Sequence, residues 1–229
     1  MTKRASKGTK SSKLAKKSLK TSGPEPTSGQ DEWAPVPVKF DVQWPYNLEQ
    51  GSRYVELDGT YHLWVLKTDK PYKAGSKTKP RTEQRFKPDY TSGQLKYEAD
   101  IMVPSGSNGM SIMQIHTING YSSGGKKCST AFMLFWFDSD GGSLHQYSTP
   151  KPLAKNLTGE WFHLCVIHDL SKRAVTVSVN GKSVGPPIPD KPCSVKSPSY
   201  YMKDGVYVQD GASPEMEVYI KNIKMWKHP

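Results

Sequence analysis

Short runs of alternating apolar and polar residues, separated by turn residues, recur along most of this sequence. In the clearest run, residues 94–103, every second residue from Leu95 to Val103 is apolar. A side-chain period of two is that of a β-strand, because successive side chains point to opposite faces of a sheet. The run therefore predicts a strand with one buried face.

Further runs of this kind predict most of the remaining fold. They cover residues 61–66, 161–168, 174–179 and 215–226. Asn180-Gly181 is a strong signal for a two-residue hairpin turn, after which residues 182–184 can pair back. Loops are expected at 104–109 and 138–142, and no stretch of ten residues in the body has helical periodicity. Strands at this spacing over about 195 residues predict an all-β chain that forms a two-sheet β-sandwich.

The net charge of +11 is concentrated at the N-terminus. Residues 1–20 contain eight of the 32 basic residues and no acid, so the rest of the chain has a net charge of only +3. Residues 1–32, rich in Lys and Ser, are predicted to be a disordered tail, and residues 33–229 the folded domain. The tail could contact a polyanion, but nucleic acid is not the partner expected for the domain.

Other classes of protein and site are disfavoured. The longest apolar run, residues 131–137, is far shorter than the roughly 20 residues of a membrane helix. Cys128, Cys165 and Cys193 allow at most one disulfide and form no metal motif. No apolar segment follows the first basic residues, so the sequence as written predicts an intracellular protein.

Two of the expected strands carry polar residues at a spacing of two. Arg81, Glu83 and Arg85 share one face of the first strand, and Gln114 and His116 share one face of the second. Arginine holds carboxylates through its planar fork, and histidine can act as a general base near neutral pH. The alternatives are an exposed charged ladder and a structural histidine.

A third strand adds cationic and phenolic groups. Tyr201, Lys203, Tyr207 and Gln209 are expected on one side, with Gly205 leaving space between them. Tyrosine can donate or accept a proton, and lysine can neutralise an anion. An amphipathic edge strand with side chains in solvent is the alternative.

Together the three strands describe a site for an anion with groups that move protons. No strand carries the alternating carboxylates of a retaining β-sandwich glycanase, because Glu98 and Asp100 alternate but have no third partner. Glycoside hydrolysis usually requires such paired carboxylates. No phosphate-binding glycine loop or zinc motif occurs in the sequence.

Three blocks in this order resemble the signatures of the alginate-lyase-type polysaccharide lyases, which are similar to glucuronan lyases and to plant citrate-binding proteins. They are Arg81-Thr-Glu, Gln114-Ile-His and Tyr201-x-Lys-x-Gly-Val-Tyr-x-Gln. The resemblance covers roughly residues 35–228. The stretches 90–93, 103–106 and 166–169 are most similar to the citrate-binding branch.

The resemblance implies a concanavalin-like β-jelly roll whose groove takes an acidic polysaccharide, with no metal or organic cofactor. It implies β-elimination in a 4-linked uronate chain, with the uronate carboxylate neutralised by Arg81 and Gln114. His116 or Tyr207 would take the C5 proton, and Tyr207 would protonate the leaving oxygen. Glu83, Arg85, Tyr201, Lys203 and Gln209 would serve substrate binding.

Some residues depart from the lyase pattern. Met202 and Asp204 stand where lyases commonly have Phe and a small residue, and Asp204 is expected to point away from the site. Citrate-binding relatives tend to lack the histidine that His116 provides here, which favours catalysis. Secreted lyases carry a signal peptide, which this sequence lacks.

The leading hypothesis is therefore a polysaccharide lyase acting on a uronate polymer. A non-catalytic protein that binds citrate, another small carboxylate or an acidic glycan is the alternative. A third hypothesis is an intracellular enzyme that uses the same groove for a small substrate. The uronate, the mode of cleavage and the oligomeric state are not predicted.

Overall fold

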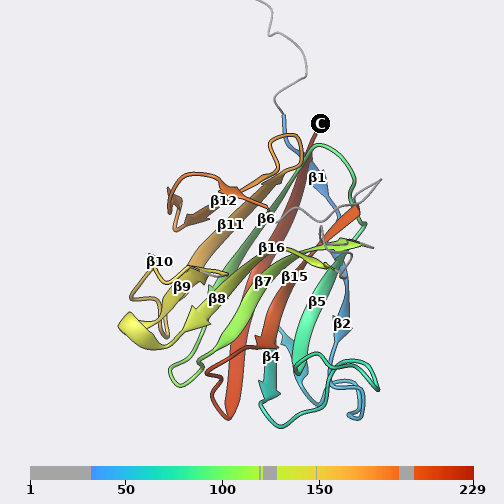
Figure 1. Ribbon diagram of the computed structural model, residues 1–229, viewed down its shortest axis with the longest axis vertical. Helices are drawn as coiled ribbons and strands as arrows, with labels where there is room; N and C mark the ends of the chain where they lie inside the picture. The colour runs from blue at the N-terminus through green and yellow to red at the C-terminus, as the bar shows by residue number, and fades with distance from the viewer. Residues whose placement is uncertain (1–31, 119, 121–127, 148, 191–198) are drawn as a thin grey trace, which may run out of the picture. The chain divides into compact units, whose positions relative to one another are not determined.

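The computed structural model describes residues 32–118, 120, 128–147, 149–190 and 199–229, in which the chain is almost entirely β-structure. The one helical element among these residues is a single 3-10 turn, η1 (Ser139–Gly141). All strands pair antiparallel with their neighbours in two sheets (Figure 1). The predicted all-β sandwich is confirmed. The predicted tail lies outside the described residues.

Sheet A has nine strands with a central path of seven. In spatial order the path is β13 (Lys182–Ser183), β12 (Ala174–Val179), β11 (Phe162–Asp169), β6 (Gln94–Met102), β16 (Glu215–His228), β4 (Thr60–Leu66) and β3 (Tyr54–Leu57). Two short strands complete it, β1 (Ala34–Val36) beside β16 and β14 (Ile188–Pro189) beside β12.

Sheet B has seven strands. Their order is β10 (Pro152–Ala154), β9 (Ser143–Gln146), β8 (Thr130–Phe137), β7 (Met110–Ile118), β15 (Ser199–Val208), β5 (Arg81–Lys87) and β2 (Lys39–Gln43). Strands β15 and β16, the last two along the chain, thus lie inside sheets B and A respectively.

The core lies between the sheets and is built from the alternation seen in the sequence. In β6 the odd-numbered residues from Leu95 to Ile101 are buried, and the even-numbered residues are half-buried on the other face. Trp136 of β8 stacks on Phe162 of β11, with ring centroids 6.2 Å apart. Burial of these apolar and aromatic side chains between the sheets stabilises the sandwich.

Strand β15 of sheet B is distorted where it passes the first residues of β7. Between Asp204 and Tyr207 the register with β7 shifts, whereas the register with β5 stays regular. Gly205 has a φ of 120° at this point, and a Cβ on it would collide with the carbonyl oxygen of Thr82. Glycine is therefore required here to let β5 approach β15 closely.

The cysteines do not form a metal site in the described part of the chain. Cys128 is disulfide-bonded, and Cys193 lies outside the described residues. Cys165 of β11 is a free thiol, and burial raises its pKa to about 11. Over the same residues, no helix has the length and apolar character needed to cross a membrane.

Candidate active site on sheet B

Strands β5, β15 and β7 are neighbours, so the three polar motifs meet on one face of sheet B. We call the face of this sheet that points away from the core the cleft face. In the register, Lys203 lies opposite both Arg85 and Gln114. Tyr201 lies opposite His116, and Tyr207 opposite Arg81. Residues in register share a face of the sheet, which explains how distant segments build one site.

A cleft of about 690 Å³ lies over these strands. Seven of the nine predicted site residues line it: Arg81, Arg85, Gln114, His116, Tyr201, Lys203 and Tyr207. The remaining walls come from β2, from residues 72–78 and from the adjoining parts of β7 and β8, and include Asp41, Gln43, Tyr72, Lys73, Ser76, Thr78, Ser129 and Thr130.

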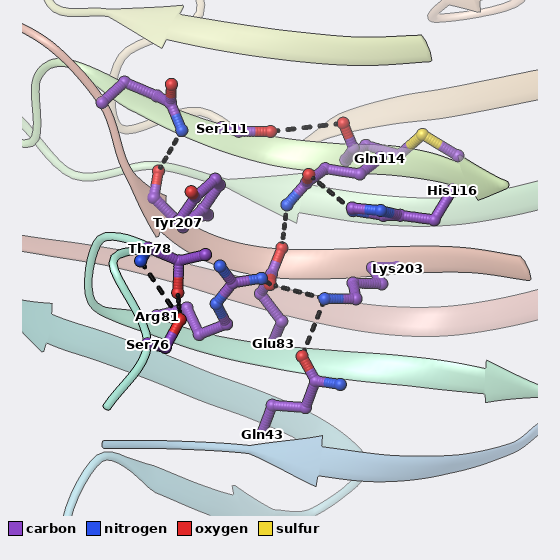
Figure 2. A network of polar contacts seen from close by, with 12 residues as sticks. Gln43, Ser76, Thr78, Arg81, Glu83, Ser111, Gln114, His116, Lys203 and Tyr207 are labelled. Atoms are coloured by element: carbon purple, nitrogen blue, oxygen red, sulfur yellow. Dashed lines mark hydrogen bonds and ion pairs between the residues drawn. The ribbon is translucent and has the colours of Figure 1, made fainter. Parts of the chain in front are cut away.

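Glu83 is the centre of a buried polar network beneath this cleft (Figure 2). Its Oε2 accepts hydrogen bonds from Arg81 Nη1 at 3.2 Å and from Lys203 Nζ at 3.1 Å. Its Oε1 accepts one from the side-chain amide of Gln114. Lys203 also donates to Gln43 Oε1 at 2.7 Å. Glu83 therefore orients three donors of the cleft at once.

The orientation of Gln114 fixes the tautomer of His116. Because the amide nitrogen of Gln114 donates to Glu83, its Oε1 must accept from His116 Nε2, 2.9 Å away. The proton of a neutral ring is thus on Nε2, and Nδ1 keeps its lone pair. Burial, with Lys203 and Arg81 nearby, holds the pKa of His116 well below 6.5, so the ring is neutral at neutral pH.

Two arginines pack over two tyrosines at opposite ends of the cleft. The guanidinium carbon of Arg81 lies 4.1 Å from the ring centroid of Tyr207, and that of Arg85 lies 4.2 Å from Tyr201. The ring of Tyr201 also stacks on His116, with centroids 5.2 Å apart and planes 8° from parallel. These cation–π and stacking contacts hold the rings in fixed positions.

The cleft carries an excess of positive charge. Arg81, Arg85, Lys203 and Lys73 line it, and three carboxylates offset only part of this charge: Asp41 in the lining, Glu83 beneath it and Asp89 paired with Arg85. Burial lowers the pKa of Lys203, and the adjacent Glu83 carboxylate opposes that shift. A positive site with oriented N–H donors is suited to a carboxylate ligand.

Two predicted site residues are not part of the cleft lining. Glu83 is 1% exposed and lies under the cations. Gln209 follows the end of β15, and its Nε2 donates to the backbone oxygen of Tyr207 at 3.5 Å. In contrast, Asp41 and Gln43 were missed, although they alternate with apolar Phe40 and Val42 in the same way as the predicted motifs.

Asp204 points away from the cleft, as expected. It is 1% exposed, and its Oδ2 accepts a hydrogen bond of 2.6 Å from Tyr97 of sheet A. Burial, reinforced by the charge of nearby Glu83, raises its pKa to about 8. Asp204 is therefore a neutral acid within the core at neutral pH.

The donor set suits an anion better than a metal ion. No group of three or more His, Cys, Asp or Glu side chains that could hold a metal occurs among the described residues. The polar groups that face the cleft are mainly N–H donors and phenols.

Known proteins resemble this chain in sequence and in fold. A citrate-binding protein from Hevea brasiliensis is 35% identical over 205 residues, which cover 89% of this chain and 79% of that protein. An alginate lyase from Pseudomonas aeruginosa has a TM-score of 0.62 at 16% identity, covering 83% of this chain and 98% of that structure. An alginate lyase from Zobellia galactanivorans has a TM-score of 0.58 at 19% identity, covering 84% and 94%.

The two structural matches show that the fold is the β-jelly roll of these lyases. A sequence model of the family described as alginate lyase matches residues 38–227, which include every motif of the cleft. The chain therefore belongs to the alginate lyase family.

Proposed function

We propose that this protein is a polysaccharide lyase that cleaves a uronate-containing chain by β-elimination. The observation that carries the proposal is the Glu83 network, which aims Arg81, Gln114 and Lys203 at one positive cleft beside His116 and Tyr207. Family membership supports lyase chemistry, and the positive cleft supports an acidic substrate.

The first requirement of the reaction is to stabilise negative charge on the substrate. Loss of the C5 proton of a uronate leaves negative charge on C5, and this charge delocalises into the adjacent carboxylate. Arg81 and Gln114 would hold that carboxylate, and Lys203 would add positive charge behind it. Such oriented donors lower the barrier because their geometry is fixed before the reaction.

The second requirement is proton transfer in both directions. A base takes the C5 proton, the C5–H electron pair forms the C4=C5 double bond, and the C4–O pair leaves with the glycosidic oxygen. Tyr207, half-buried at the cleft, would give that oxygen its proton. The base is Tyr207 itself or neutral His116, whose Nδ1 is buried. This burial favours Tyr207 as the base and His116 as the residue that orients Gln114.

The test is the ultraviolet absorbance of the unsaturated uronate formed from glucuronan, alginate and related polymers. If the assignment is right, Tyr207→Phe lowers kcat by roughly 100- to 10,000-fold. Gln114→Ala lowers kcat by roughly 100-fold or more. Tyr46→Phe, which changes an exposed tyrosine outside the cleft, is the control and leaves kcat unchanged. Unchanged turnover in both Tyr207→Phe and His116→Ala would refute the assigned roles.

A second candidate function is binding of a small carboxylate without chemistry. The identity to a citrate-binding protein and the cationic cleft favour it. Calorimetry with citrate and with uronate oligomers separates the two functions. Binding that depends on Arg81 and Lys203, without any unsaturated product, would select the second candidate.

A further inference from the structure

The cleft face of sheet B continues beyond the cleft onto β8 and β9, and there its character changes. Tyr207 lies in register with Ser111 of β7, Ser111 with Phe135 of β8, and Phe135 with His145 of β9. These four residues form one row across adjacent strands, which lie side by side in Figure 1. The row spans three strand spacings, about 14 Å.

The far end of this row is aromatic. Phe135 and Phe137 are half-buried on the cleft face, whereas Trp136 between them points into the core. His145 packs edge-to-face on Phe137 at 5.1 Å, and Tyr147 packs in the same way on Phe135 at 5.3 Å. We call Phe135, Phe137, His145 and Tyr147 the aromatic sector. Its rings support one another and keep partly accessible apolar surface beside the charged cleft.

The charge of the face divides along the same row. No Lys, Arg, Asp or Glu occurs in β8 or β9, whereas the opposite half carries Arg81, Arg85 and Lys203. A ligand that matches both halves has a carboxylate at one point and apolar ring faces on units further along. A uronate chain has this chemistry, since each sugar ring presents C–H groups on its faces. A small tricarboxylate cannot reach from Tyr207 to His145.

We propose that the aromatic sector is a subsite that binds sugar units two or more places along the chain from the uronate held by Arg81 and Gln114. The inference rests on the proposed function and adds that the substrate is an oligomer or polymer. Phe135 and Phe137 supply the apolar contact surface, and His145 and Tyr147 position their rings. The sector contributes to substrate binding and takes no part in proton transfer.

The experiment compares uronate oligosaccharides of two and six units, from both glucuronan and alginate, with the wild type and the double variant Phe135→Leu/Phe137→Leu. Leucine retains apolar volume, so the variant preserves packing and loses only the rings. We expect KM for the six-unit oligomers to rise about tenfold or more, with kcat nearly unchanged. KM for the two-unit oligomers should not change.

Controls separate this inference from the proposed function. Leu57→Ala, at an exposed apolar residue of β3 on the other sheet, leaves both KM values unchanged. A melting temperature of the double variant within a few degrees of the wild type establishes its fold. Phe135→Tyr, which keeps the ring, should keep the wild-type KM. If the wild type cleaves hexamers and the double variant does so with the same KM, the inference alone is overturned. A wild type that neither binds nor cleaves any uronate oligomer overturns the proposed function, and the inference with it.

Discussion

The ammonium group of Lys203 lies 3.1 Å from the Glu83 carboxylate, and the side chains of both residues are at most 3% exposed. The attraction within a buried ion pair is largely offset by the cost of removing both charges from water. Removing one partner is nevertheless strongly destabilising, because it leaves the other charge buried and unpaired. This pair therefore ties the stability of sheet B to the geometry of its cleft.

Removing the charge of Glu83 should leave Lys203 and Arg81 without their common acceptor. Glu83→Gln is expected to lower the free energy of unfolding by on the order of 3 kcal/mol at pH 7, measured by urea denaturation. Without the carboxylate the folded-state pKa of Lys203 falls further below its unfolded value, so the deficit should shrink as pH rises towards 9. Lys87→Ala, which breaks the exposed pair with Asp41, is the control and should cost no more than about 1 kcal/mol.

The depressed pKa of His116 predicts how this residue affects acid stability. The unfolded state binds a proton near pH 6.5 and the folded state only at lower pH, so His116 destabilises the fold as pH falls below 6.5. The stability of the wild type relative to His116→Gln should therefore drop by about 1.4 kcal/mol per pH unit below that point. Urea denaturation of both proteins between pH 7 and pH 5 tests this. A difference independent of pH would show that the folded protein protonates His116 normally.

Asp204 should act with the opposite sign. Its folded-state pKa of about 8 lies above the unfolded value, so the folded state retains a proton that the unfolded state has lost between pH 4 and pH 8. Stability contributed by Asp204 therefore decreases as pH rises through that window. Asp204→Asn, which keeps an acceptor for Tyr97, should gain stability relative to the wild type by up to about 1.4 kcal/mol per pH unit. Equal differences at pH 5 and pH 8 would mean that Asp204 is ionised in the fold.

Gly205→Ala tests the close approach of β15 and β5. The added Cβ would meet the carbonyl oxygen of Thr82, so we expect the free energy of unfolding to fall by more than about 2 kcal/mol. Gly59→Ala is the matched control, because Gly59 also has positive φ but has nothing within 4 Å of such a Cβ. That variant should lose only about 1 kcal/mol, the conformational cost alone. Similar losses in the two variants would contradict a steric role for Gly205.

The sequence was sufficient to predict local features of the site. A period of two fixes which residues of a strand share a face, so the grouping of Arg81 with Arg85 and of Gln114 with His116 followed directly. The same alternation predicted the buried face of β6. These predictions needed no knowledge of which strands are neighbours.

Features that depend on pairing between distant segments were not predictable in this way. Nothing local places β15 between β5 and β7, so the sharing of Glu83 by Arg81, Lys203 and Gln114 emerged only from the sheet order. Gln43 was missed although β2 shows the same alternation, because nothing local shows that β2 pairs with β5. Gln209 was assigned to the cleft by extending the alternation past Val208, where β15 ends.

The order of synthesis has a consequence for this architecture. Strands β15 and β16 hold the middle of sheets B and A, yet residues 199–228 leave the ribosome after every strand they join. Until then β5 and β7, and likewise β4 and β6, have open edges with no partner between them. Such edges expose backbone groups that can pair with other chains. Sheet B therefore becomes continuous only after β15 has been synthesised, and sheet A only after β16, so both sheets depend on pairing between segments that are far apart in the sequence.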